Sequence, residues 1–290
     1  MRKRISKTLS NVLFPEDVGK VYNSFDVVGN IAIIKLPSNS QVNLQTIAMA
    51  IMNRHRNIKT VLLQASPVTG ELRLRRLTYV AGERKTNTIH SEYDCSFSVD
   101  VEKCYFSPRL SYERMRIAKL VESHETIVNM FAGVGCFSII IAKYADPEKV
   151  FSIDISPEAV HYMQENIRLN RVYGKVTALL GDSKKIVNKR LQEVANRVLM
   201  PLPEKALEYL PCALSALKMS GGWIHYYGLE HSTKIENPVE KAKLKLVKAL
   251  EALDVDFKVP VVRVVRSTGP NWFQFVADIQ VLQQQYSCRQ

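Results

Sequence analysis

Several features that would assign this 290-residue chain to other classes of protein are missing from its sequence. No uninterrupted apolar run approaches the ~20 residues that are needed to span a bilayer, so we expect no membrane segment. Three of the first four residues are basic, but no apolar h-region follows them, and we therefore expect no signal peptide. Internal repeats and low-complexity segments are also missing. These absences favour a cytoplasmic globular protein, which we expect to be a monomer.

The chain has few cysteines, and none of them forms a C-x-x-C pair. Their number is odd and they are scattered, at Cys95, Cys104, Cys136, Cys212 and Cys288. This pattern favours reduced, buried thiols over a disulfide framework or a zinc site, so we expect no metal. Cys136 follows a glycine-rich turn, and we interpret it as a packing residue.

Acidic residues are outnumbered: 28 Asp and Glu face 40 Lys and Arg, which gives a net charge of +12. Such an excess predicts a polyanionic partner, although a generally lysine-rich surface would give the same total. The basic residues gather in the first part of the chain, in three groups within residues 54–59, 73–85 and 109–119. We therefore expect residues 1–104 to form a small, basic α+β domain that binds nucleic acid.

Residues 105–290 are expected to form a second domain, organised around a strand, a glycine-rich turn and a helix. A short apolar run ends in Gly133-Val134-Gly135, and the next apolar run ends in Asp154. This order is typical of a nucleotide-like cofactor held in an α/β sheet. The third glycine of the dinucleotide motif is missing, which disfavours a pyrophosphate cofactor and suits S-adenosylmethionine. An ordinary strand-to-helix turn is the alternative.

Strands and helices continue to alternate after Asp154, which predicts a parallel sheet with helices between its strands. One strand ends before Asp182 and another before a loop that begins at Pro201. Ligands bind at the carboxyl ends of such strands, so we expect Asp154 to contact ribose hydroxyls and Asp182 an adenine amino group. A helix N-cap is the alternative for each. His225 is interpreted as a core residue, and two closing strands, 259–266 and 273–282, as an antiparallel pair at the sheet edge.

Several of these segments together resemble the archaeal/eukaryotic tRNA guanosine-37 N1-methyltransferase family, from about residue 24 to near the C-terminus. The resemblance rests on residues 71–73, on the Ser-Pro-Arg-Leu-x-x-Glu-Arg stretch 107–114, on Phe-Ala-Gly-Val-Gly at 131–135, and on Asp154 and Asp182. It implies a Rossmann-like S-adenosylmethionine-dependent methyltransferase domain behind a small domain. It also implies a tRNA partner, bound through the anticodon stem-loop.

The resemblance further implies roles for individual residues. Glu113 matches the general base that removes the N1 proton of guanine, and Arg73 matches the arginine that supports O6. Tyr105 matches an aromatic near the target base, which Pro201 would also face. The positions implied around the cofactor are Arg109, Phe131, Gly133, Gly135, Asp154, Asp182, Leu202 and Pro203.

Elementary chemistry agrees with these roles. Guanine N1 carries a proton at neutral pH, so it becomes a nucleophile only when a base removes that proton. Charge then develops on O6, where a fixed cation stabilises it. For Glu113 the alternative is an ion pair within its helix, with Arg109 or Arg116. Such a pair would lower the pKa of Glu113 and weaken it as a base.

The chain departs from the family pattern at Pro201, where the family has Asn-Leu-Pro. Proline has neither a side-chain amide nor a backbone N–H, so it cannot contact the target base as the family's asparagine does. The acceptor is therefore either guanosine or a tricyclic wyosine-type derivative at the same position. A further N-terminal domain, common in the family, has no room before residue 24. Two alternatives remain: aminocarboxypropyl transfer, which related wyosine-pathway enzymes perform, and a catalytically weak tRNA-binding protein. The relatives that transfer the aminocarboxypropyl group normally lack an arginine at the position of Arg109, so its presence here favours methyl transfer.

Overall fold

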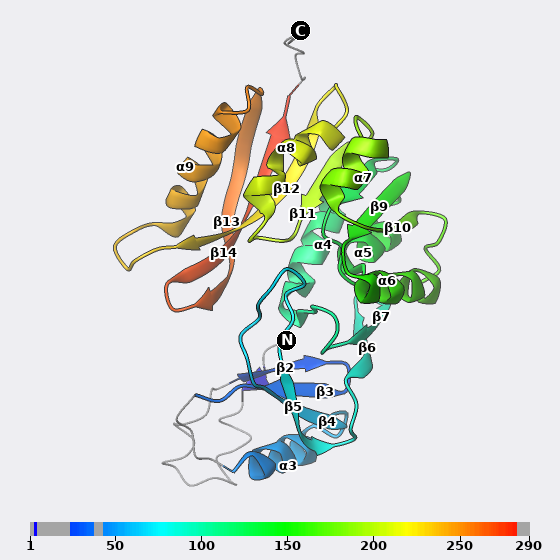
Figure 1. The fold of residues 1–290 in the computed structure, drawn as a ribbon, viewed down its shortest axis with the longest axis vertical. Coiled ribbons are helices and arrows are strands. Elements are labelled where there is room, and N and C mark those ends of the chain that lie inside the picture. Colours follow the sequence, from blue (N-terminus) through cyan, green and yellow to red (C-terminus); the bar gives the residue numbers. More distant parts are fainter. Residues whose placement is uncertain (1–2, 5–23, 38–42, 283–290) are drawn as a thin grey trace.

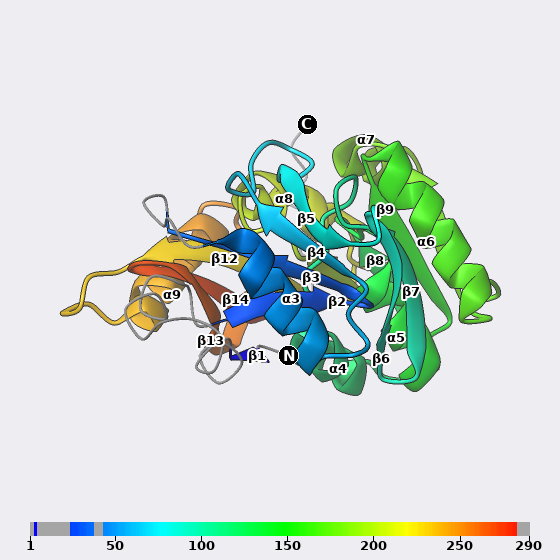
Figure 2. The same cartoon turned by 90° about the horizontal axis from the view of Figure 1, so that it is seen from below.

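The computed structural model describes residues 3–4, 24–37 and 43–282, and it contains two domains (Figure 1). The small domain is a five-stranded sheet in the order β1-β2-β3-β4-β5, with one helix, α3, on its outer face (Figure 2). Its elements are β1 (Lys3–Arg4), β2 (Ser24–Val28), β3 (Ile31–Ile34), α3 (Leu44–Arg54), β4 (Thr60–Gln64) and β5 (Leu77–Gly82). The predicted α+β composition of this part is confirmed.

Helix α3 begins where its sequence supplies an N-cap and packs through one apolar face. The side chain of Asn43 accepts hydrogen bonds from the backbone N–H groups of Gln45 and Thr46, at 2.9 and 3.3 Å. Ile47 and Ile51, one turn apart, are fully buried against the sheet. The helix therefore covers one face of the small sheet and leaves the other face to the rest of the molecule.

A two-stranded hairpin, β6 (Asn87–Glu92) and β7 (Cys95–Asp100), connects the two domains. On one side the backbone N–H of Gly29 donates to His90 Nδ1 at 3.1 Å. On the other side the Asn166 amide bonds both backbone groups of Ser98, at 2.6 and 3.0 Å. Since the hairpin is attached to both domains, a boundary near residue 105 stays a prediction.

The second domain is built on a seven-stranded sheet in the order β10-β9-β8-β11-β12-β14-β13 (Figure 1). Its strands are β8 (Thr126–Asn129), β9 (Lys149–Asp154), β10 (Val176–Leu180), β11 (Arg197–Met200), β12 (Gly222–His231), β13 (Phe257–Gly269) and β14 (Trp272–Val281). The first five run parallel, and β14 is antiparallel to both of its neighbours. The predicted antiparallel pair is confirmed, but the last strand lies inside the sheet and β13 forms the edge.

Helices cover both faces of this sheet, which confirms the predicted Rossmann-like α/β fold. They are α4 (Ser111–Leu120), α5 (Cys136–Tyr144), α6 (Pro157–Leu169), α7 (Ser183–Arg190), α8 (Ala206–Ala216) and α9 (Pro238–Glu251), with a short 3-10 turn, η1 (Pro108–Leu110), before α4. Buried residues of α4, α5 and α6 form one core, and those of α7, α8 and α9 form the other. The first core continues through β7 into the small domain, so apolar packing joins the two domains.

Four of the five cysteines lie in the described part of the chain, and each is a buried, free thiol. Burial raises the pKa of Cys136 to about 12, which agrees with the prediction of a packing residue. Cys288, near the C-terminus, and Met1 and Arg2 at the N-terminus lie outside the described residues. No helix within the described ranges is long and apolar enough to cross a membrane.

Candidate active site

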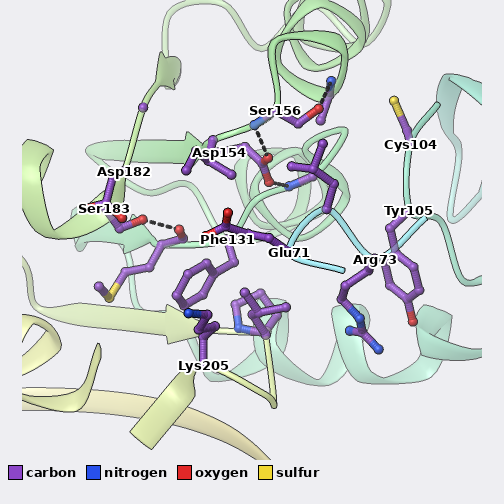
Figure 3. A pocket seen from close by; sticks show the side chains of 18 of the residues that line it. Glu71, Arg73, Cys104, Tyr105, Phe131, Asp154, Ser156, Asp182, Ser183 and Lys205 are labelled. Carbon is purple, nitrogen blue, oxygen red and sulfur yellow. Dashed lines mark hydrogen bonds between the residues drawn. The ribbon is translucent and has the colours of Figure 1, made fainter. Parts of the chain in front are cut away.

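A pocket opens at the carboxyl ends of β8, β9, β10 and β11, where an α/β sheet usually binds its ligand (Figure 3). Side chains from the small domain close its other side. Among the predicted residues, Arg73, Tyr105, Phe131, Gly133, Asp154, Asp182, Pro201 and Leu202 line this pocket. The structure therefore brings together most of the residues that the sequence analysis singled out, from four strand ends and the small domain.

Asp154, the last residue of β9, is fixed by the backbone around it (Figure 3). One carboxylate oxygen accepts the N–H of Gly133 at 2.7 Å, and the other accepts the N–H of Ser156 at 2.9 Å. Burial raises the pKa of Asp154, although these N–H donors act in the opposite direction. Ser156 caps α6, so Asp154 is free of the N-cap role. Each carboxylate oxygen keeps acceptor capacity toward the pocket.

The two glycines of the turn have different reasons to be glycine. Gly133 lines the pocket with a φ of +57°, and a Cβ there would meet no atom closer than 3.9 Å. Gly135, with a φ of +91°, does not line the pocket; a Cβ there would lie 2.9 Å from Met163 Cγ on α6. Gly133 leaves space on the ligand side, whereas Gly135 allows α5 to begin close to α6.

Asp182 combines the two roles that the sequence left open. It lines the pocket, and its Oδ1 also caps α7 by accepting the N–H of Lys185 at 3.1 Å. Its Oδ2 accepts the hydroxyl of Tyr209. Burial tends to raise the pKa of Asp182, but the hydrogen bond from Tyr209 and the backbone donors lower it on balance. Helix α7, which Asp182 starts, was not predicted from the sequence.

Arg73 approaches the pocket from the small domain on a strained turn. Its φ of 53° lies in the left-handed region, at a cost of roughly 1–3 kcal/mol. The guanidinium stacks on the ring of Tyr105, 4.2 Å from its centroid (Figure 3). It also pairs with Glu204 at 3.4 Å. Its Nε is buried with no hydrogen-bond partner among the described residues. As a cation that lines the pocket, Arg73 is suited to stabilise an acceptor that becomes negatively charged.

The loop after β11 forms the floor of the pocket on the small-domain side. Pro201 and Leu202 line the pocket, whereas Pro203 is buried beneath it. Phe131 packs edge-on against Tyr209, with ring centroids 5.1 Å apart. Three further residues that line the pocket were not predicted from the sequence: Ser183, Lys205 and Tyr209. Their only local signal was position, directly after strand ends or in the following helix.

Glu113 lies outside the pocket lining, in a buried ion cluster between α4 and the antiparallel strands. Its Oε1 accepts the Tyr227 hydroxyl at 3.0 Å and Arg116 Nε at 2.9 Å. Its Oε2 accepts a guanidinium N–H of Arg263, which is only partly buried. The intrahelical pair that the sequence analysis weighed is thus present with Arg116, and two further donors complete it. The role of Glu113 as a base stays a prediction.

The ion cluster around Glu113 extends across the sheet. Arg116 donates to both oxygens of Asp278, at 2.7 and 3.1 Å, and Asp278 contacts His225 Nδ1 at 2.6 Å. His225 Nε2 in turn contacts Arg197, which pairs with Glu125 at 2.6 Å. His225 is fully buried, and burial lowers its pKa. It is a core residue, as predicted.

Arg109, like Gly135 and Pro203, is a predicted cofactor residue that does not line the first pocket. Its Nε donates to Asp26 of β2 at 2.7 Å, so it links η1 to the small domain. It lines a second pocket, which shares Arg73 and Tyr105 with the first. Arg109 does not line the first pocket, because its side chain turns toward Asp26, and its contact with the cofactor stays a prediction.

The first pocket fits S-adenosylmethionine by the chemistry of its lining. Asp154 offers acceptors for ribose hydroxyls, and Asp182 lies at the next strand end for an adenine amino group. Phe131 and Leu202 provide apolar surface, and Lys205 provides a cation for the amino-acid carboxylate. The open space over Gly133 permits close approach of a ligand to the backbone. Among the described residues, no cluster of His, Cys, Asp and Glu could hold a metal ion.

The fold and this pocket define a Rossmann-like methyltransferase domain with a small domain in front of it. The sequence matches the TRM5/TYW2 methyltransferase domain over residues 88–255 and the TYW2 N-terminal domain over residues 5–86. The chain belongs to the TRM5/TYW2 methyltransferase family, which confirms the resemblance that the sequence motifs indicated.

Known members of the family are similar over most of the chain. The tRNA (guanine(37)-N(1))-methyltransferase Trm5b of Pyrococcus abyssi is 41% identical, covering 89% of this chain and 74% of its own. The tRNA 4-demethylwyosine(37)-methyltransferase Taw21 of Saccharolobus solfataricus is 35% identical, over 91% and 96%. A tRNA(Phe) (4-demethylwyosine(37)-C(7)) aminocarboxypropyltransferase of Methanocaldococcus jannaschii is also 35% identical, over 76% and 85%.

Two solved structures support the same assignment. The crystal structure of Trm5b from Pyrococcus abyssi superposes with a TM-score of 0.82 at 39% identity, covering 93% of this chain and 79% of the other. The complex of aTrm5 with tRNALeu superposes with a TM-score of 0.81 at 32% identity, over 96% and 78%.

Proposed function

We propose that this chain transfers a methyl group from S-adenosylmethionine to the purine at position 37 of a tRNA, either to N1 of guanosine or to a wyosine-type derivative. The observation that carries this proposal is the position of Arg73 and Tyr105 beside an acid-lined pocket at the strand ends. The small domain thereby supplies a cation, and the segment between β7 and η1 supplies an aromatic ring, where an acceptor base would meet the cofactor. Family membership supports the same chemistry.

In this proposal the pocket acids hold the cofactor and orient it. Asp154 accepts hydrogen bonds from ribose hydroxyls while its backbone donors keep the carboxylate in place. Asp182, steadied by Tyr209, accepts from the adenine amino group. When bound, S-adenosylmethionine supplies an activated methyl group on a sulfonium, so the protein's main task is alignment.

On the acceptor side, Arg73 and Glu113 have complementary roles. Arg73 lines the first pocket, and its guanidinium charge supports the negative charge that develops on O6 as the N1 proton leaves. Glu113 receives that proton, for which its carboxylate must exchange a present donor for the base. Arg263 is the donor that can leave, because its side chain is about one-third exposed, whereas Tyr227 is buried. The target base would leave its stack to reach this site.

Pro201 leaves the identity of the acceptor open within the proposal. It lines the pocket but offers neither a side-chain amide nor a backbone N–H to a guanine edge. An apolar ring at this place is compatible with a tricyclic base as well as with guanine. The relatives named above act on both kinds of substrate.

Aminocarboxypropyl transfer from the same cofactor is the second candidate. Two observations support this candidate. Residues 5–86 match the TYW2 N-terminal domain, and the chain is similar to the aminocarboxypropyltransferase of Methanocaldococcus jannaschii. Arg109, which this chain keeps, favours methyl transfer. A tRNA-binding protein with weak catalysis is the remaining alternative.

Isotope transfer separates these three functions. The chain is incubated with tRNA that carries either guanosine or a preformed tricyclic base at position 37, and with methyl-labelled or carboxyl-labelled S-adenosylmethionine. We expect methyl label alone in the tRNA, and mass spectrometry of the nucleoside then identifies the acceptor atom. Carboxyl label in the tRNA would reject methyl transfer, and the absence of both labels would leave the binding protein.

The partner in this proposal is the anticodon stem-loop, bound by a single copy of the chain in the cytoplasm. The net charge of +12 and the solved aTrm5–tRNALeu complex support a tRNA partner. Charge-driven binding predicts a steep loss of affinity with salt.

A further inference from the structure

A second pocket lies directly beside the first and is formed by both domains. The two pockets share Arg73 and Tyr105 as a common wall. The second pocket also receives side chains from β2, from the end of β3, from η1 and from β13. Its charged lining residues are Asp26, Lys35, Arg73, Arg75, Arg109, Glu204 and Arg266.

These residues leave the second pocket with an excess of three positive charges. The two carboxylates are already used: Asp26 pairs with Arg109 at 2.7 Å, and Glu204 with Arg73 at 3.4 Å. Across residues 24–37 and 43–282, no carboxylate forms an ion pair with any of the other three cations, Lys35, Arg75 and Arg266.

Neutral partners hold two of these three cations in place. Arg266 donates to Gln274 at 2.8 Å, to the Ser107 hydroxyl at 3.0 Å and to the Tyr105 hydroxyl at 3.1 Å. Arg75 donates to the side chain of Gln64 at 3.3 Å. The guanidinium groups are thus positioned without being neutralised, as in sites that recognise phosphate through arginine.

The titration behaviour of the lining agrees with a positive field. Burial lowers the pKa of Lys35, and Arg109 lowers it further. Burial also lowers the pKa of Arg75, although Asp26 acts in the opposite direction. Burial alone would raise the pKa of Tyr105, but Arg73, Arg266 and Arg75 outweigh it and lower that pKa. Like charges are therefore held together at an energetic cost that a bound anion would offset.

We propose that the second pocket binds one phosphodiester of the RNA strand, at or next to the nucleotide whose base enters the first pocket. This inference rests on the proposed function for the identity of the strand. A phosphodiester fits because it is a compact anion with two exposed oxygens, and arginine and lysine are its usual partners. The shared wall of Arg73 and Tyr105 places it beside the target base, so the contact would fix the position of the extruded nucleotide.

The test is a double-mutant cycle between the protein and the RNA backbone, read by equilibrium binding without turnover. The protein variant is Lys35→Met with Arg75→Met, which leaves the Arg73 and Arg266 contacts in place. The RNA variant is an anticodon stem-loop with a single uncharged methylphosphonate linkage on either side of nucleotide 37. The matched protein control is Lys189→Ala, an exposed lysine of α7 at the end of the molecule away from the small domain (Figure 1).

We expect the protein variant to bind unmodified RNA on the order of tenfold more weakly and to lose about 1 from the slope of log affinity against log salt. One of the two methylphosphonate linkages should weaken wild-type binding similarly and the variant no further. The proposal is overturned if, for both linkages, the loss of affinity caused by the methylphosphonate simply adds to the loss caused by the protein variant. Inorganic phosphate that binds wild type tightly while neither linkage matters would assign the pocket to a free anion, and would also overturn it.

Two measurements keep this inference separate from the proposed function. Calorimetry with S-adenosylmethionine should give the same affinity for the variant as for wild type, which confirms that the first pocket is intact. If the cycle shows coupling but tRNA receives no methyl label, the proposed function fails and the phosphate site stands. If methylation is normal and the cycle shows no coupling, only the phosphate site fails.

Discussion

Asp154 and Glu113 lie in the same domain, but their carboxylates differ in hydrogen-bond partners and in access to the first pocket. Asp154 accepts one backbone N–H on each oxygen and faces a pocket. Glu113 is buried, accepts three side-chain donors and does not line the first pocket. The first arrangement is ready for a ligand, whereas the second is complete without one.

This difference indicates an order of events. The cofactor side is fixed by backbone groups of the sheet, so it needs no substrate to assemble. On the acceptor side, Glu113 takes part only after one of its donors leaves, and an incoming RNA could supply the replacement. The contrast therefore predicts that cofactor affinity and turnover respond to different residues.

Replacing the acid on the acceptor side should give the largest effect. Glu113→Gln keeps the shape but removes the basic oxygen, and we expect turnover to fall by roughly 10²- to 10⁴-fold. Cofactor affinity should change little, because Glu113 does not line the first pocket. The measurement is single-turnover methylation at saturating tRNA, with calorimetry for the cofactor.

A purely structural role for Glu113 has a different signature. It would lower the melting temperature and leave the pH dependence of single turnover unchanged in the variant. Loss of the rising limb of the pH–rate profile is expected if Glu113 is the base. Unchanged turnover of Glu113→Gln at saturating tRNA would remove it from catalysis.

The contrast between the two acids also shows how far the sequence could be interpreted. Asp154 was predictable because strand, turn and acid are adjacent in the chain, and strand ends converge in a parallel sheet. The donors to Glu113 were not, since Tyr227 and Arg263 lie 114 and 150 residues away. Only Arg116, one turn along the same helix, was within reach of a local pattern.

The same limit applies to the fold and to Arg109. Alternating strands and helices predicted the α/β architecture, but no local signal places β14 between β12 and β13. Arg109 pairs with Asp26, 83 residues upstream, across a domain contact that sequence spacing does not reveal. The second pocket escaped prediction for this reason, because its cations come from both domains.

The ion cluster behind Glu113 provides the next prediction, on stability. Asp278 is buried between Arg116 and His225, and Asp278→Asn leaves these groups without their carboxylate. Breaking such a buried pair costs about 3–5 kcal/mol of unfolding free energy. Urea denaturation at pH 7, monitored in the methyltransferase domain, measures the loss.

The pH dependence of that loss follows from the pKa of Asp278. Burial tends to raise this pKa, but His225 and Arg116 hold it well below its usual range. A depressed folded-state pKa contributes stability that is present above the unfolded-state value, near 4, and is lost as the pH falls below it. The difference between wild type and Asp278→Asn should therefore shrink in acid, and a difference that is constant from pH 7 to pH 3 would contradict this account.

Asp154→Ala should give the smallest of the three effects and confine it to the cofactor. It removes the acceptors for the ribose hydroxyls and frees the Gly133 N–H. Hydrogen bonds to a charged group are worth about 1.5–3 kcal/mol, so we expect S-adenosylmethionine to bind roughly 10- to 100-fold more weakly in calorimetry. Turnover at saturating cofactor should fall far less than in Glu113→Gln. The control is Glu165→Ala, an exposed acid on α6, which should leave cofactor affinity unchanged. Equal cofactor affinities for Asp154→Ala and wild type would contradict the assignment of cofactor binding to Asp154 and of proton removal to Glu113.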